Sequence, residues 1–464
     1  MQKLQWCSFC LNRLALPCPH RGCESPEESS MPTNAPAPKA KDDARGNLIE
    51  LRRIVPSDMV ERTPGHPFTP APGLERRRGE GAVQKFTLQT GVEVFLVTEV
   101  AQARAVLSDT RFSSDRVRHP DAALAPRPGS APQESRPVTA REDGMFIFMD
   151  PPEHTRLRKL LTGQFTVRRM KALEERVREI AIEHIEAMKA AGTSADLVTA
   201  YALPIPSLMI CELLGVDYAD HDEFQANTAT PLNLDTTDEE KAAATRAQYE
   251  FMTRLVAQKR ERPADDLLSG LLEADPPLND RQLADIGLVL LGAGHETTAN
   301  MIALGTLGLL QNPEQLAALR ADPSLIETGV EELMRYLSIS GFLTRVATED
   351  VTVDDTVIPE GSTVMVSLMV TNRDPSVFPD PDDLDFSRGR ISHLGFGHGI
   401  HQCLGQQLAR IEMRVAFTEL LTRLPDLRLA VPVDEVALRN NMIVFGAHSL
   451  PVTWSRPTDA GPGR

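Results

Sequence analysis

Residues 396–410 read FGHGIHQCLGQQLAR and place Cys403 at the start of a predicted helix. From Leu404 onward the apolar residues recur three or four positions apart, which is the spacing of one helix face. Gly399 precedes the cysteine and Gly405 follows it, so the loop can bring its backbone close to another group. The partial positive charge at a helix N-terminus favours the thiolate form of Cys403.

A lone thiolate with one open face suits a haem iron, because thiolate is the ligand that promotes cleavage of the O–O bond. The alternative for a single cysteine is a buried structural thiol. The spacing decides between them, because the segment resembles the haem-binding signature of the cytochromes P-450. The signature positions around the cysteine are filled by Phe396, Gly399, His401, Gly405 and Ala409. The resemblance implies that Cys403 is the axial ligand of haem b.

Composition limits the classes of protein to which the chain can belong. Of its 464 residues 41% are hydrophobic and 25% are charged, and the formal net charge is -16. So negative a chain has no general affinity for nucleic acid, because phosphate binding needs a basic field. Six cysteines in so long a chain do not form a disulfide scaffold and indicate a reducing compartment. No run approaches the roughly 20 apolar residues that span a membrane, so we expect a soluble, cytoplasmic monomer.

The first 30 residues carry four cysteines and one histidine whose spacings could hold zinc, namely Cys7, Cys10, Cys18, Cys23 and His20. The second pair of cysteines does not form a CxxC motif, and a linker rich in Pro, Ala and Ser follows. We therefore prefer a dispensable extension to a zinc site. Residues 1–46 are predicted to be a disordered extension and linker, and 47–464 to form one domain.

The rest of the chain is predicted to be mainly helical with a small β region. Helices are expected from Thr98 to Leu107, from Pro151 onward, and over 168–191, 203–215 and 238–262. Strands are expected at Val83–Leu88 and Val92–Val97 as a hairpin, at Val351–Val353 and Val364–Leu368, and in a terminal hairpin, Met442–Trp454. Residues 115–143 are a candidate substrate loop and 225–237 a candidate lid.

The longest apolar run, from Asp280 to Leu310, predicts a helix of about 45 Å through the core. Its middle reads AGHETT, and a carboxylate and hydroxyls inside a buried helix need partners or water. One alternative is that the threonine bonds back to a carbonyl of its own helix. The stretch resembles the oxygen-binding groove of the family, which implies that Glu296 and Thr297 deliver protons to dioxygen and that Ala293 lies against the haem.

Further residues resemble the haem-binding set of the family. His154 and Arg158 lie four apart on one predicted helix and, without context, would be a solvated surface pair. Within DPPEHTRLRKLL they resemble the H-x-x-x-R pair that binds the haem propionates. Arg345 and His401 resemble additional propionate ligands. A final pair, Glu332 and Arg335, resembles the ion pair that braces the haem pocket.

The resemblance implies a single haem-enclosing domain with the fold of the cytochromes P-450, of the soluble ferredoxin-dependent bacterial type. Such an enzyme inserts one oxygen atom from dioxygen into a C–H bond or an alkene of a bulky apolar molecule, here a polyketide or macrolide, a terpenoid or a xenobiotic. Electrons would come from NAD(P)H through a ferredoxin reductase and a ferredoxin. The alternatives are a peroxide-dependent enzyme of the same fold and a haem-based gas sensor or binding protein.

Two surfaces are expected around the haem. The substrate cavity should draw on the candidate loop and lid and on Leu291, Ala293, Gly341, Phe342, Leu343, Met442 and Ile443. The face that receives the ferredoxin should be basic, with contributions from Arg156, Lys159, Arg168, Arg169, Lys171, Arg410 and Arg414. Ferredoxins are acidic, so docking there would be steered by charge.

Overall fold

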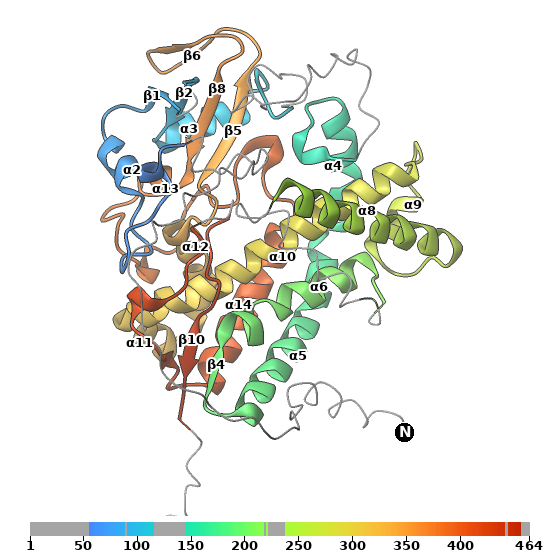
Figure 1. The fold of residues 1–464 in the computed structure, drawn as a ribbon, viewed down its shortest axis with the longest axis vertical. Helices are drawn as coiled ribbons and strands as arrows, with labels where there is room; N and C mark the ends of the chain where they lie inside the picture. Colours follow the sequence, from blue (N-terminus) through green and yellow to red (C-terminus); the bar gives the residue numbers. More distant parts are fainter. Residues whose placement is uncertain are drawn as a thin grey trace, which may run out of the picture. The chain divides into compact units, whose positions relative to one another are not determined.

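Helix α10 (Asp280–Gln311) crosses the middle of the fold (Figure 1). Reciprocal bonds close its N-terminus, because the Asn279 side chain accepts from the N–H of Gln282 and the Gln282 side chain accepts from the N–H of Asn279. Residues 298–309 are all buried, so this part of the helix presents no face to solvent. The predicted bounds are confirmed to within one residue.

The computed structural model describes residues 55–88, 91–115, 144–217, 220, 237–440 and 444–455, all within one compact unit, Gly46–Arg464. Several sequence predictions fall outside these residues: the extension 1–46 with its cysteines, nearly all of the 115–143 loop, nearly all of the 225–237 lid, and Met442 and Ile443.

Helices form most of the described chain. They are α2 (Pro72–Arg77), α3 (Val100–Ser108), α4 (Glu153–Gln164), α5 (Val167–Ala191), α6 (Pro204–Leu214), α8 (Asp238–Glu261), α9 (Leu267–Leu272), α11 (Pro313–Ala321), α12 (Ile326–Leu337), α13 (Leu368–Thr371) and α14 (Gln406–Arg423). Short 3-10 turns occur at Ser57–Met59, Phe146–Phe148, Pro323–Leu325, Phe386–Arg388, Gly399–His401 and Val433–Glu435, and a π turn at Val198–Ala202. The helices predicted from sequence are confirmed, with ends that differ by up to two residues.

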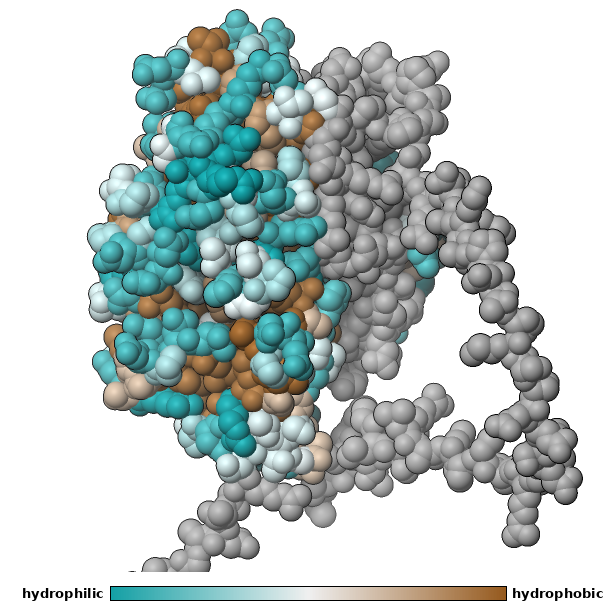
Figure 2. All heavy atoms as spheres, turned by 60° about the vertical axis from the view of Figure 1, so that its left-hand side comes forward, coloured by the Kyte–Doolittle hydropathy of each residue, from teal (hydrophilic) through white to brown (hydrophobic). Residues whose placement is uncertain are grey.

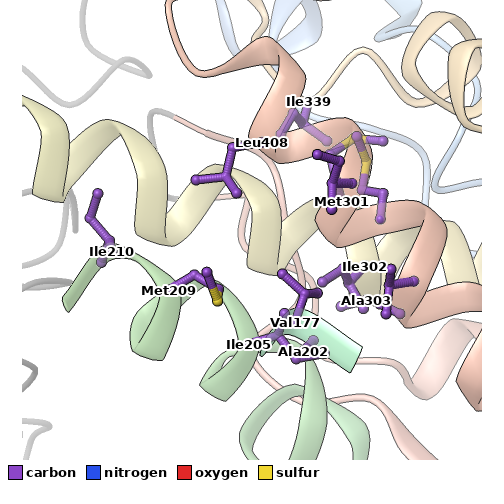
Figure 3. Packing of buried hydrophobic residues seen from close by; sticks show 14 of the residues in the cluster. Val177, Ala202, Ile205, Met209, Ile210, Met301, Ile302, Ala303, Ile339 and Leu408 are labelled. Atoms are coloured by element: carbon purple, nitrogen blue, oxygen red, sulfur yellow. The ribbon is translucent and has the colours of Figure 1, made fainter. Parts of the chain in front are cut away.

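The main core lies where α6 and α14 pack on α10 and α5 packs on both α14 and α6. In Figure 3 Val177 of α5 and Ile205 of α6 point toward Ile302 and Ala303 of α10. These four side chains are fully buried. Burial of a large aliphatic side chain contributes about 1.5–3 kcal/mol, so this contact fixes α10 against its neighbours.

Three small sheets accompany the helices. The five-stranded sheet has the order β1-β2-β8-β5-β3 and consists of β1 (Val83–Thr87), β2 (Glu93–Val97), β3 (Phe112–Ser113), β5 (Phe342–Ala347) and β8 (Thr363–Ser367). Strands β2 and β8 pair in parallel, whereas the other pairs are antiparallel. A two-stranded sheet joins β6 (Val351–Val353) to β7 (Thr356–Ile358). The predicted hairpin of β1 and β2 is confirmed, with Val83 opposite Val97.

The prediction of a simple terminal hairpin over Met442–Trp454 is wrong for the residues that the structure describes. Strand β10 (Pro451–Thr453) pairs instead with β4 (Ser194–Asp196) and β9 (Arg428–Leu429) in a third sheet. Val444 forms a single bridge to Ser340. Leu450 and Val452 are fully buried, so burial of these side chains draws the segment to distant strands instead of to its own neighbours.

Arg335 and Glu332 form the predicted buried ion pair on α12. Nε and Nη2 of Arg335 donate to the two carboxylate oxygens at 2.7 and 2.8 Å. The remaining N–H groups donate to three carbonyl oxygens, those of Asn372, Pro381 and Asp383, at 2.6–3.0 Å. A guanidinium has five N–H donors, so every one is used, and one side chain fixes the loop that leads toward Cys403.

The surface is largely polar on the face drawn in Figure 2, where hydrophilic residues predominate and hydrophobic ones form separate areas. Among the helices that the structure describes, none is both long and apolar enough to span a membrane.

Candidate functional site

Cys403 opens into a cavity of about 360 Å³ between the 396–403 loop, α10 and β5. Seven of the predicted site residues line this cavity: Cys403, Phe396, His401, Arg158, Arg345, Ala293 and Thr297. A larger cleft of about 1010 Å³ lies between α11 and the segment 377–392, and its lining contains none of the predicted site residues. The smaller cavity is therefore the candidate functional site.

The cysteine loop is held by its own backbone. The N–H of Cys403 donates to the carbonyl of Phe396 at 2.8 Å. Gly399 has φ +72°, and a Cβ there would lie 2.2 Å from the carbonyl oxygen of Leu107, so only glycine fits. Helix α14 begins at Gln406 with Gly405 as its N-cap, two residues later than the apolar spacing predicted.

The surroundings of the Cys403 thiol shift its pKa in the direction opposite to the one that a helix N-terminus favours. Burial raises the pKa of the Cys403 thiol above its ordinary value. The N–H of Gly405 and the guanidinium groups of Arg158 and Arg410 lower the pKa, but by less than burial raises it. A metal deprotonates a thiol that coordinates it, so a bound iron would supply the charge that the loop alone does not.

Cationic and imidazole groups gather on one wall of the site. The ring centroids of His154 and His401 lie 4.1 Å apart, and Arg158 and Arg345 line the same cavity. Burial, followed by the charges of Arg158 and Arg345, lowers the pKa of His154. Burial, followed by His154 and the charges of Arg345 and Arg158, lowers the pKa of His401 to about 3. In the described part of the chain, neither ring nitrogen of His154 has a hydrogen-bond partner, nor has Nε2 of His401. A group with two carboxylates fits this wall, because buried donors need acceptors.

The AGHETT stretch continues α10 without a break. Thr297 faces the cavity, but its hydroxyl donates to the carbonyl of Ala293 at 2.7 Å. The alternative in which the threonine bonds to a carbonyl of its own helix therefore describes the structure, and this bond occupies the hydroxyl that the groove would use. Gly294 packs against α6, where a Cβ would lie 3.3 Å from Ile210.

Glu296 lies behind the cavity wall and is only 2% exposed. One of its oxygens accepts from Nη1 of Arg439, and the other lies 3.7 Å from Nδ1 of His295. Arg439 was not predicted as a partner of Glu296, because no local signal in LRNN indicates a contact 143 residues away. The acid and the alcohol of the motif are thus bonded to different groups.

The walls above the cysteine are mostly apolar. Phe342 and Leu343 line the cavity as predicted, whereas Gly341 and Leu291 are not among its lining residues in the described part of the chain. The lining also includes residues that were not predicted from the sequence, among them Ile147, Phe148, Met301, Ile339 and Ser340. Ile147 and Phe148 are 40% and 37% exposed. Their apolar run, FIF, stands directly before the histidine helix and could have been noticed.

Only some of the cations of the predicted basic face are exposed, and others are paired with carboxylates. Lys159, Arg168 and Lys171 are exposed, and Val167 beside them is 61% exposed. Arg410 instead bonds both oxygens of Glu331 at 2.6 and 2.9 Å.

His393 also bonds the Glu331 carboxylate that pairs with Arg410, and a further ion pair reduces the positive charge of this face. Although burial would raise the pKa of Glu331, bonds from His393 and Arg410 lower it to about 2. Arg414 pairs with Glu327, which neutralises a second predicted cation. Arg169 lies 3.7 Å from Asp265, so the exposed positive charge of the predicted face is carried by Lys159 on α4 and by Arg168 and Lys171 at the start of α5.

Comparisons with known proteins agree with this arrangement. Residues 215–425 match the family model described as Cytochrome P450. Cytochrome P450-SU2 of Streptomyces griseolus is 46% identical over 416 residues, which are 88% of this chain and 100% of that protein. Pentalenic acid synthase of Streptomyces avermitilis is 43% identical over 392 residues, 84% of this chain and 95% of the relative. The crystal structure of CYP105P1 in complex with filipin I has a TM-score of 0.79 at 40% identity and covers 87% of this chain and 99% of that one.

Proposed function

Because the chain belongs to the cytochrome P450 family of monooxygenases, we propose that it hydroxylates or epoxidises a bulky apolar small molecule. One atom of dioxygen enters the substrate, and the other leaves as water with two electrons and two protons. We assign the electrons to NAD(P)H, passed on by a ferredoxin reductase and a ferredoxin. The observation that carries the proposal is the position of Cys403, which opens into a cavity whose wall carries His401, Arg158 and Arg345.

The residues present fit a haem. Cys403 would hold the iron through Sγ, and the four groups His154, Arg158, Arg345 and His401 would bind the propionates. A bound haem with thiolate ligation supplies the activation of dioxygen. The protein keeps the site oriented through the Cys403–Phe396 backbone bond and through the glycine at 399.

Protons reach the cavity through α10 in this proposal. Thr297 would hold a proton at Oγ1, and Glu296 would replace that proton from behind the wall. Thr297 is placed for this role because it lines the cavity, and Glu296 because it is the next residue and is buried. Each group must first leave its present partner, the Ala293 carbonyl or Arg439.

The cavity supports an apolar substrate. The apolar side chains of Ile147, Phe148, Phe342 and Leu343 line the same cavity as Cys403, and Met301 adds an adaptable side chain. A polyketide or macrolide, a terpenoid and a xenobiotic all remain consistent with these walls. Filipin I, which is bound in the related CYP105P1 structure, belongs in the first set of compounds to be tried.

The test measures NADPH consumption and product formation with a surrogate ferredoxin and reductase. A compound panel that includes filipin I is first screened by a spectral titration that reports displacement of water from the iron. Product that depends on NADPH and dioxygen supports the proposal. Product formed only with added peroxide, or ligand binding without turnover, would overturn it in favour of the peroxide-dependent enzyme or the sensor.

A further inference from the structure

The segment 436–447 carries a buried cation onto the acid of α10. Nη1 of Arg439 donates to Oε2 of Glu296, and their side chains are 11% and 2% exposed. Removal of two charges from water is costly, so a buried pair needs a fixed geometry to persist. The Arg439 contact therefore sets the orientation of the Glu296 carboxylate.

That orientation keeps the acid away from the alcohol. Oε2 is bonded to Arg439, and Oε1 is nearest to His295, at 3.7 Å. The cavity lining includes Thr297 but, within the described part of the chain, does not include Glu296. A proton can pass from Glu296 to Thr297 only after the carboxylate turns away from the guanidinium.

Three contacts besides the ion pair hold the segment that carries Arg439 in place. The backbone N–H of Arg439 donates to the carbonyl of Gly446 at 2.8 Å. Gly446 lies so close to α10 that a Cβ there would be 1.9 Å from Oδ1 of Asn300, one turn beyond Glu296. Phe445 donates its N–H to the carbonyl of Ile339 at 2.9 Å, and Ile339 lines the cavity. The segment is thus anchored both to the acid's own helix and to the cavity wall.

We propose that Arg439 is a positioning residue that restrains Glu296 and so limits proton delivery to the cavity. The inference rests on the proposed role of Glu296 as the acid that replaces the proton of Thr297. Arg439 touches neither substrate nor haem in this scheme and acts only through the carboxylate. Replacement of Arg439 by glutamine removes the restraint on the Glu296 carboxylate, whereas replacement by lysine keeps a positive charge at the same position.

The first test measures unfolding of the oxidised haem protein in urea, without turnover, for Arg439→Gln, Glu296→Gln and the double variant. Each single change should lower the midpoint, because it leaves one buried polar group of the pair unmatched. The double variant should be more stable than the sum of the two changes predicts. Strict additivity would show that the two groups do not interact and would overturn the proposal.

The second test follows reoxidation of chemically reduced protein by dioxygen between pH 6 and 9, with no substrate, reductase or ferredoxin present. Arg439→Gln should reoxidise several-fold faster than the parent, with the largest ratio at low pH, and Arg439→Lys should stay close to the parent. In a Glu296→Gln background the Arg439→Gln change should have no further effect. A merely structural arginine would leave the pH profile unchanged.

The outcomes separate the two proposals. If Glu296→Gln alters neither reoxidation nor product per NADPH, Glu296 is not the acid, and the role of Arg439 falls with it. If Glu296→Gln is defective but Arg439→Gln has the same effect in both backgrounds, only the role of Arg439 is overturned.

Discussion

The hydroxyl of Thr297 donates to the carbonyl of Ala293 at 2.7 Å, one turn earlier on the helix that walls the cavity. Thr306, nine residues further along the same helix, makes the same bond to the carbonyl of Ile302 at 2.9 Å. Thr297 faces the cavity, whereas Thr306 is 0% exposed in the core. The two threonines share a local geometry and differ in surroundings, so they form a matched pair for mutation.

Thr297→Ala is expected to keep haem binding and NADPH consumption while product per NADPH falls several-fold and hydrogen peroxide rises. The reason is that the hydroxyl which passes the proton is gone, while no propionate or iron contact is lost. Thr306→Ala should cost only about 1 kcal/mol of stability and leave the product ratio unchanged. An unaltered ratio in Thr297→Ala would mean that another group carries the proton.

Cys403→Ser is expected to lose the red-shifted Soret band that reduced thiolate haem gives with carbon monoxide. Serine lacks the sulfur ligand but preserves the size of the side chain. Cys211→Ser is the control, because Cys211 is the other free cysteine of the described chain and is buried on α6. A band that persists in Cys403→Ser, or vanishes in Cys211→Ser, would contradict the assignment.

Glu412→Gln is expected to make stability less dependent on pH. Burial raises the pKa of Glu412 from 4.5 to about 8, although a bond with Thr298 lowers it in part. The folded state therefore binds an extra proton between those values, and stability falls as pH rises from about 4.5 to about 8. At about 1.4 kcal/mol per pKa unit, the glutamine variant should gain several kcal/mol over the parent by pH 8.

Urea unfolding of the haem protein from pH 5 to 9 measures this gain. Glu419→Gln is the control on the same helix, because Glu419 is bonded to Arg178 and Arg423 at 2.6 and 2.9 Å. Loss of that paired carboxylate should destabilise the protein across the range. A constant difference between Glu412→Gln and the parent at all pH values would refute the prediction.

Charge reversal at Lys159 and Arg168 is expected to slow reduction by ferredoxin several-fold and to flatten its salt dependence, since both cations are exposed on α4 and α5. Arg320→Glu is a suitable control, because Arg320 is exposed on α11, which Figure 1 places away from α4. Unchanged rates in the double reversal would place docking elsewhere.

A chain that begins at Met31 is expected to bind haem and turn over substrate as the full chain does. This prediction rests on sequence alone, namely the irregular cysteine spacing and the linker that follows it. Zinc analysis of the full chain provides the check. One equivalent of zinc that the protein needs in order to fold would contradict it.

Local signals predicted the helices well, because the chemistry that ends a helix is itself local. Asn279 and Gln282 form the cap that starts α10, and both are visible in the sequence. Strand β5 was missed although it carries Arg345, because TRVATED lacks a continuous apolar alternation and the strand is stabilised by pairing with β8 and β3.

Which side chains of a buried helix face the cavity could not be predicted from the sequence. Helix α10 is apolar on all sides through much of its length, so its pattern does not show which residues face the cavity. Leu291 was assigned to the cavity wall and Met301 was not, and the structure shows the reverse. Long-range pairs such as Arg439 with Glu296 depend on how distant segments meet, which no periodicity encodes.

The five donated N–H groups of Arg335 have a mechanical consequence. A planar group that binds a carboxylate and three carbonyl oxygens, at Asn372, Pro381 and Asp383, allows its loop almost no travel without breaking bonds to a buried charge. Lysine has three donors and cannot replace it. The loop that leads to Cys403 is accordingly stiff, so we expect an expansion that admits a large guest to come from other parts of the cavity wall, such as the exposed Ile147 and Phe148. Laboratory evolution toward larger guests should therefore accumulate changes there and leave the Arg335 loop untouched.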